Sequence, residues 1–119
     1  MPALSLRLWR LAFAACLAVV LALALMPIDQ RLPSTGWDKS DHLLGFVVLT
    51  LLGVRAFPQR KSRVAIALLA YGIAIELLQA LTPYRFAEWR DVVADAAGIG
   101  LAMLVIQVAR GDRKERAAS

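Results

Sequence analysis

Polar side chains that can do chemistry recur near the ends of the apolar segments of this sequence. Three pairs are separated by three or four residues: Asp38 with His42, Glu76 with Gln79, and Asp91 with Asp95. Residues at these spacings share one face of a helix, so the members of each pair can act together. Carboxylates and an imidazole can exchange protons or hold a hard cation, and an amide can donate or accept a hydrogen bond. Lys39 and Arg85 lie close by in the sequence and supply positive charge.

Glu76 stands out because it lies inside the long apolar run of residues 64–82. Placing a charge at the centre of a membrane helix costs about 2.5–3.5 kcal/mol, and less toward the interface. Such a carboxylate is a functional candidate by default and needs a partner within the protein. Arg85 and His42 can both fill that role. Arg85 is favoured, because its planar guanidinium group can bridge a carboxylate.

Structural explanations exist for most of these residues. Asp38 and Asp91 each precede an apolar segment, where Asp is a favoured helix cap. A histidine at a membrane interface, such as His42, is more often solvated than a ligand, although its chemistry also suits proton transfer. Glu76 has no such simple explanation. The sequence therefore indicates a polar site without assigning a catalytic role to any residue.

Composition places the chain in a membrane. Of its 119 residues, 60% are apolar, and they fall in runs rather than at amphipathic spacing. The net charge is +5, but the basic residues flank the apolar runs and form no stripe with exposed aromatics, which argues against nucleic acid as a partner. Cys16 is the single cysteine, which excludes an internal disulfide and a zinc site built on cysteine pairs. The sequence has no metal-spaced histidine pair, so we expect no metal and no cofactor.

Four membrane-spanning helices are expected in one domain covering residues 1–119, at about residues 9–26, 38–57, 64–82 and 91–109. The predicted fold class is all-α, a polytopic membrane four-helix bundle. Ala94, Gly98 and Ala102 recur every four residues and predict a close contact between two helices. The charged tail from residue 110 onward is expected to be frayed. A signal peptide cleaved near Ala22–Leu23–Ala24 is the alternative explanation of the first segment.

Lysine and arginine residues gather on alternate connections of this predicted bundle. They precede the first segment, lie between the second and the third, and follow the fourth, whereas acids balance or outnumber them in the other two connections. The positive-inside rule then places both termini in the cytoplasm. The polar pairs and Arg85 consequently fall together at the outer face of the membrane.

Across about residues 38–100, the sequence resembles the VanZ-like membrane proteins. The shared features are Asp38–Lys39 with His42, the segment Glu76–Leu77–Leu78–Gln79, and then Arg85, Asp91, Asp95 and Gly98. Those proteins have a similar size and four predicted spans, and they usually carry asparagine where this chain has Asp95. The resemblance implies a multi-pass protein of the bacterial inner (cytoplasmic) membrane. The founding member is linked to low-level resistance to the glycopeptide teicoplanin, and the resemblance alone does not extend that phenotype to this chain.

Three functional hypotheses follow. In the first, the outer polar residues bind a lipid-linked envelope precursor or a glycopeptide antibiotic, with Arg85 beside the free amides of the next helix ready for an anion. In the second, the same carboxylates and His42 form the acid–base or hard-metal site of a membrane enzyme acting on a lipid-linked or headgroup substrate. In the third, Glu76 couples protons in a small transporter subunit, which would require an oligomer. Membrane lipids are expected partners in all three.

Overall fold

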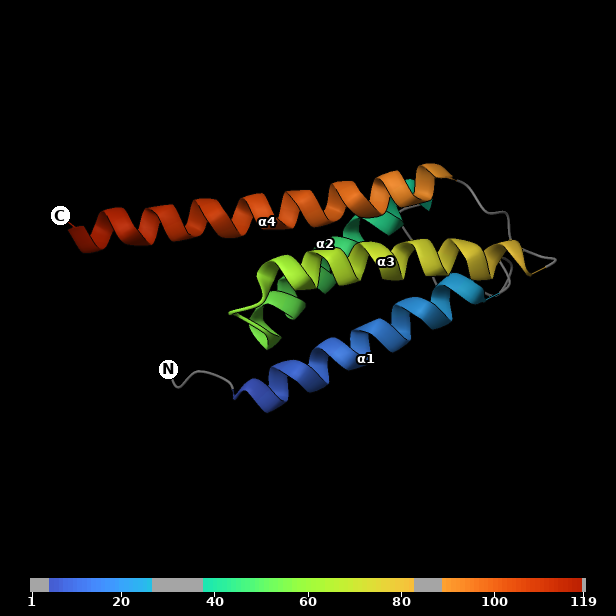
Figure 1. Ribbon diagram of the computed structural model, residues 1–119, viewed down its shortest axis with the longest axis horizontal. Helices are drawn as coiled ribbons and strands as arrows, with labels where there is room; N and C mark the ends of the chain where they lie inside the picture. Colours follow the sequence, from blue (N-terminus) through green and yellow to red (C-terminus); the bar gives the residue numbers. More distant parts are fainter. Residues whose placement is uncertain (1–4, 27–37, 83–88, 119) are drawn as a thin grey trace.

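Four helices make up the described part of the computed structural model, which covers residues 5–26, 38–82 and 89–118 and leaves out the side chains of residues 38–40. They are α1 (Leu6–Leu25), α2 (Asp38–Ala56), α3 (Lys61–Ala80) and α4 (Trp89–Ala118). Successive helices run in opposite directions, so α1 and α3 end where α2 and α4 begin (Figure 1). Both chain termini lie at the other end of the bundle (Figure 1). The predicted all-α four-helix bundle is confirmed.

Helices α1, α3 and α4 are each long and apolar enough to cross a membrane. Helix α2 is not among the described helices that meet this criterion, because its 19 residues include four charged ones, Asp38, Lys39, Asp41 and Arg55. All four of these charges lie in the first or last turn of α2. Helix α2 contacts each of the other three helices. Its central position reduces the surface that lipid has to cover, so fewer apolar residues are needed.

The most extensive helix contact is between α2 and α4. Gly98 makes it possible, since a Cβ atom at this position would lie 2.5 Å from the backbone oxygen of Leu43. Ala102, one turn further along α4, is fully buried. The close approach predicted from the small residues of the fourth segment is therefore confirmed. Within the described residues, α1 and α4 make no contact, so they lie on opposite sides of α2 and α3.

Helix α3 presents one continuous buried stripe to the bundle. Its members recur every three or four residues and are Val64, Leu68, Gly72, Ile75, Glu76 and Gln79. This is the spacing that keeps side chains on one face of a helix. The first half of the stripe is apolar and packs with Phe46 and Leu49 of α2 in the core. Its second half is polar, and the same face that builds the core therefore delivers Glu76 to the interior.

Helix α1 is fastened to α3 by two hydrogen bonds. The Tyr71 hydroxyl donates to the backbone oxygen of Leu17, and Gln79 Nε2 donates to the backbone oxygen of Ala24 at 2.8 Å. The carbonyls of the last turn of a helix have no partner within that helix, so Gln79 satisfies a group that burial would otherwise penalise. Ala24, part of the alternative cleavage motif, is buried in the bundle. This packing favours a permanent span over a removable signal peptide.

The helix ends differ from the predicted ones by up to three residues, except at the end of α4, where the difference is larger. Helix α3 begins at Lys61 rather than near residue 64. Helix α4 continues to Ala118, so the expectation of a frayed tail from residue 110 is wrong. Most residues of this tail favour helix, and Asp112 precedes Arg116 by four residues, a spacing at which opposite charges stabilise a helix.

Candidate functional site

Four polar side chains from three helices meet at the end of the bundle where α2 and α4 begin. His42 comes from the second turn of α2, Glu76 from the polar end of the α3 stripe, and Asp91 and Asp95 from the first turns of α4. We call these four residues the His42 cluster. Asp91 and Asp95 share one helix face, as their spacing predicts, and both are buried.

His42 sits between the two aspartates of α4. Its Nδ1 atom lies 2.8 Å from Asp95 Oδ1, which is a hydrogen-bond distance. Its Nε2 atom lies 3.7 Å from Asp91 Oδ2, too far for a hydrogen bond but within range of an ion pair when the ring is protonated. When Asp95 is ionised, its carboxylate can only accept, and it then receives the Nδ1 proton of His42. This leaves Nε2 as the ring atom that faces Asp91.

The hydrogen bond between His42 and Asp95 lies in the protein interior, where both side chains are shielded from solvent. The Asp95 side chain is 0% exposed and the His42 side chain is 9% exposed. A buried polar group that loses its partner costs about 1–3 kcal/mol, so each residue holds the other in place. Asp95 also abuts α3, where a Cβ atom at Gly72 would lie 2.7 Å from Asp95 Oδ2. Gly72 therefore provides the space that the carboxylate occupies.

Three members of the cluster can offer ligand atoms to one cation. One atom each from His42, Glu76 and Asp91 lies within 4.8 Å of the others. Carboxylate oxygens and an imidazole nitrogen suit a divalent metal such as Zn²⁺ or Mn²⁺. Asp95 would then hold the imidazole from its other nitrogen, as carboxylates commonly do for metal-bound histidines. The same set can also move a proton, because His42 lies between two carboxylates.

An apolar cavity adjoins His42. Its volume is about 130 Å³, and apolar residues of α1, α2 and α3 form most of its wall. Among them are Val20, Leu23 and Ile75, while Asp41 and His42 form the polar part. The cavity is smaller than the ~300 Å³ at which small-molecule sites usually begin, so it can hold only a short piece of a larger ligand.

The predicted polar site also included Gln79, Asp38, Lys39 and Arg85, which are not members of the His42 cluster. Gln79 is almost fully buried, but its side-chain amide donates a hydrogen bond to α1, which makes it a structural link beside the cluster. The side chains of Asp38 and Lys39 lie outside the described residues. Arg85 lies outside them too, and with it the predicted pairing of Arg85 with Glu76.

Sequence reasoning identified all four members of the His42 cluster but overlooked Gly72. A signal for it was present, because Gly72 precedes Glu76 by four residues and so shares its helix face. A glycine at that spacing inside an apolar helix indicates that something approaches closely. The approaching group is Asp95, which lies on another helix.

Comparison with known protein families finds a match. The sequence profile of a protein family described as VanZ/LLP1 matches residues 11–110. The matched region runs from α1 into α4 and contains the whole His42 cluster. No curated protein and no solved structure matches the chain.

Proposed function

The chain belongs to the VanZ/LLP1 family of membrane proteins, and from this premise we propose that its His42 cluster binds the polar head of a lipid-linked envelope precursor. In this proposal the protein crosses the bacterial cytoplasmic membrane several times. The His42 cluster faces outward and both termini lie in the cytoplasm. The distribution of basic residues supports this orientation, because they gather at the end of the bundle that carries the termini (Figure 1).

One observation carries the proposal: a buried polar cluster lies directly beside an apolar cavity. His42 belongs to both, since it bonds to Asp95 and also lines the cavity. A ligand that fits such a pair of surfaces has a polar part joined to an apolar part. Lipid-linked precursors have this construction, and the cavity would take only the portion of the lipid next to the head.

The chemistry of the cluster indicates which polar groups it would bind. Three of its four side chains are carboxylates, which accept hydrogen bonds when ionised. They suit hydroxyl, amide and ammonium donors, such as those of a sugar or a peptide, better than they suit the phosphates of the lipid linkage. Recognition of the sugar–peptide head is therefore the expected source of specificity.

Binding to purified protein in lipid nanodiscs tests this proposal. The probe is a polyprenyl-diphosphate-linked disaccharide peptide, and the comparison ligand is the same polyprenyl diphosphate without sugar or peptide. We expect the full precursor to bind, and Glu76→Gln or His42→Gln to weaken its binding at least about tenfold through lost charge-assisted hydrogen bonds. Asp112→Asn is the matched control, because Asp112 is exposed on the α4 tail, far from the cluster.

Two results would contradict the proposal. One is equal binding of the full precursor and the bare polyprenyl diphosphate, which would show that the head is not recognised. The other is unchanged binding in well-folded Glu76 and His42 variants. Teicoplanin is tested in the same assay. Tight binding of this glycopeptide without binding of the precursor would mean that the ligand of the protein is the antibiotic and not the precursor.

A membrane enzyme acting on a lipid-linked or headgroup substrate is the second candidate. The His42–Asp95 hydrogen bond favours it, since a carboxylate that fixes one ring nitrogen orients the other, here facing Asp91, for proton transfer. The Glu76 and Asp91 carboxylates lie close enough to His42 to share that work or to hold a cation.

Turnover separates this candidate from simple binding. Purified protein is incubated with the lipid-linked precursor, with and without Mg²⁺, Mn²⁺ or Zn²⁺, and the lipid is analysed by mass spectrometry. An enzyme would change the mass of the substrate, and His42→Gln would abolish that change. Intact substrate after prolonged incubation under all metal conditions would eliminate the enzyme and leave the binding proposal standing.

A further inference from the structure

A basic pocket lies at the end of the bundle opposite the His42 cluster. It is a cavity of about 710 Å³ to which all four helices contribute, within the ~300–1,000 Å³ range typical of ligand sites. Its cationic residues are Arg55 of α2, Lys61 of α3, and Arg110 and Arg113 of α4. No acidic side chain is among the described residues that line it.

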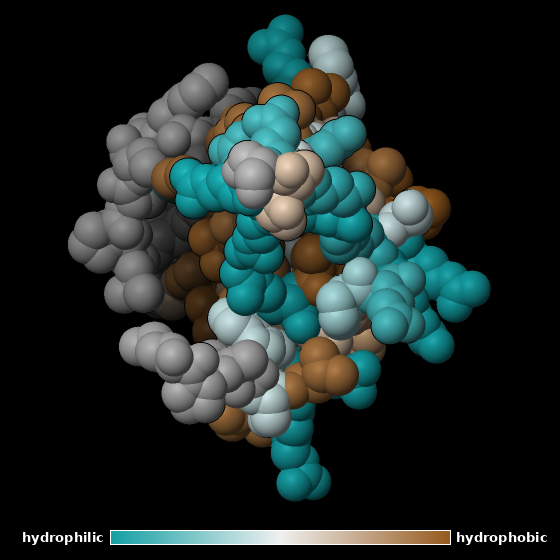
Figure 2. Space-filling view, turned by 90° about the vertical axis from the view of Figure 1, so that its left-hand side faces the viewer, coloured by the Kyte–Doolittle hydropathy of each residue, from teal (hydrophilic) through white to brown (hydrophobic). Residues whose placement is uncertain are grey.

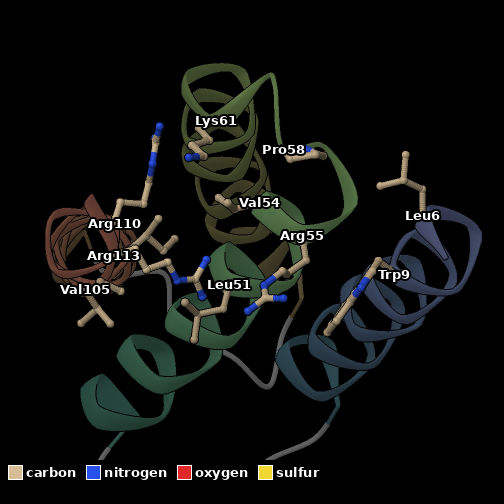
Figure 3. Close-up of a pocket in the computed structure, with 12 residues that line it drawn as sticks. Leu6, Trp9, Leu51, Val54, Arg55, Pro58, Lys61, Val105, Arg110 and Arg113 are labelled. Atoms are coloured by element: carbon tan, nitrogen blue, oxygen red, sulfur yellow. The ribbon is translucent and has the colours of Figure 1, made fainter. Parts of the chain in front are cut away.

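The cations of the basic pocket lie in two pairs. Arg55 of α2 and Arg113 of α4 reach toward each other from the two sides of Leu51, as Figure 3 shows. Lys61 and Arg110 extend into the gap between α3 and α4 (Figure 3). Within the described residues, none of these four side chains forms an ion pair. Like charges held together repel, and a bound anion would relieve that repulsion.

Trp9 fixes one of these charges. The guanidinium carbon of Arg55 lies 5.4 Å from the centre of the Trp9 ring, a cation–π contact between α2 and α1. A tryptophan of this kind is typical of the boundary between lipid and water. The basic pocket is therefore at the depth where lipid headgroups lie.

Membrane orientation alone explains why basic residues occur at this end, but not why four of them converge on a cavity. Arg7 and Lys114 lie at the same end, are exposed, and do not line the pocket. The hydrophilic side chains on this end face surround patches of hydrophobic surface (Figure 2). A second cavity, which shares Lys61 and Arg110, adds Arg60 and Arg63 to the same basic surface.

An exposed apolar stripe leads away from the pocket along α2. Leu44, Val48 and Leu51 are 50%, 47% and 38% exposed, and with Arg55 they follow the spacing of a single helix face. The stripe stays open because α1 and α4 make no contact across α2 in the described residues. From Leu44 to Arg55 it extends about 16 Å at 1.5 Å per residue. That is close to one leaflet, or half of the ~30 Å hydrocarbon core.

We propose that the basic pocket binds the phosphate of an anionic phospholipid, with an acyl chain lying along the α2 stripe between α1 and α4. Arg55 and Arg113 would hold the phosphate through charge-assisted hydrogen bonds, and Lys61 and Arg110 would add attraction for the net negative charge. The lipid would also cover the side of α2 that the other helices leave open. This site is independent of the His42 cluster and of the ligand proposed for it.

Native mass spectrometry of the purified protein measures this binding directly. The probes are phosphatidylglycerol, phosphatidylcholine and inorganic phosphate. We expect phosphatidylglycerol to bind at least about tenfold more tightly than phosphatidylcholine, and the Arg55→Gln/Arg113→Gln double variant to lose most of that preference. Arg55→Lys/Arg113→Lys, which keeps both charges, should retain much of it and shows that the fold survives substitution.

The matched control is Arg7→Gln/Lys114→Gln, which removes two charges from the same end without touching the pocket. An equal loss of phosphatidylglycerol binding in this control would overturn the proposal, because surface charge alone would then explain the effect. Equal binding of the two lipids to the unsubstituted protein would overturn it as well. Saturation of the site by inorganic phosphate, without preference for the lipid, would assign the site to a free anion instead.

Discussion

At the residue scale, His42 has a different carboxylate opposite each of its two ring nitrogens. Asp95 is bonded to Nδ1 at 2.8 Å, and Asp91 faces Nε2 at 3.7 Å. The first contact fixes the ring, and the second places Nε2 beside a carboxylate with which it could share a proton or a cation. In this arrangement Asp95 serves as the hydrogen-bond acceptor for His42 Nδ1. Asparagine, usual at this position among VanZ-like proteins, can serve in the same way, since its amide oxygen accepts the same hydrogen bond.

The first prediction concerns Asp95. Asp95→Asn keeps an acceptor opposite His42 Nδ1, so the free energy of unfolding should change by less than about 1 kcal/mol. Asp95→Ala leaves the buried Nδ1–H group without that acceptor and should cost about 1–3 kcal/mol. Thermal unfolding in detergent measures both variants, with Asp112→Ala on the exposed tail as the control. Equal melting temperatures for the Asn and Ala variants would show that the hydrogen bond contributes nothing.

At the element scale, two glycines set how closely the helices approach. Gly98 allows α4 to contact the backbone of α2 near Leu43, and Gly72 leaves room on α3 for the Asp95 carboxylate. Both lie within one turn of a member of the His42 cluster in the sequence. The packing of the helices and the geometry of the site therefore depend on the same positions.

The second prediction compares Gly98, at the contact between α2 and α4, with Gly45 of α2, which has open space beside it. A Cβ atom at Gly98 would meet the Leu43 oxygen at 2.5 Å, whereas one at Gly45 would meet nothing within 4 Å. Gly98→Ala should therefore force α2 and α4 apart and cost about 1–3 kcal/mol. Gly45→Ala should be neutral or stabilise by up to about 1 kcal/mol, since alanine favours helix. Thermal unfolding of the two variants measures these changes in stability. A Gly98→Ala protein more stable than the unsubstituted one would mean that α2 and α4 are not packed this closely.

At the scale of the whole molecule, the bundle has two chemically different ends. The His42 cluster, with its three carboxylates, lies at one end, and the basic pocket lies at the other. Alternating helix directions place the starts and ends of the helices toward these two ends, with α4 extending beyond the other three helices at the basic end (Figure 1). A membrane protein with such a charge difference is expected to insert with its basic end in the cytoplasm.

The third prediction tests that orientation. In a Cys16→Ala background, single cysteines are introduced as Ser62→Cys at the basic end and Leu81→Cys at the other; Leu81 is 81% exposed. A membrane-impermeant maleimide applied to intact spheroplasts should label position 81 and not position 62. Lysed cells provide the control in which both positions react. Labelling of position 62 alone in intact spheroplasts would mean that the His42 cluster faces the cytoplasm.

Local features of the chain were enough to predict an all-α membrane bundle and the four polar residues that gather at one end of it. Long apolar runs, breakers between them and small residues at helical spacing are local properties of the chain, and lipid imposes helices on such runs. The alternation of helix directions then placed His42, Glu76, Asp91 and Asp95 at one end. None of these steps requires knowing how any helix is rotated about its axis.

Which polar groups bond to each other, and where the cavities lie, depends on how the helices pack. His42 and Asp95 are 53 residues apart, and Gln79 and Ala24 are 55 apart. Whether such side chains meet depends on the rotation and offset of each helix, which are set by contacts such as Gly98 against Leu43. The convergence of Arg55 and Arg113 has the same origin, because sequence hydropathy explains why these charges lie at one end but not why they face one cavity.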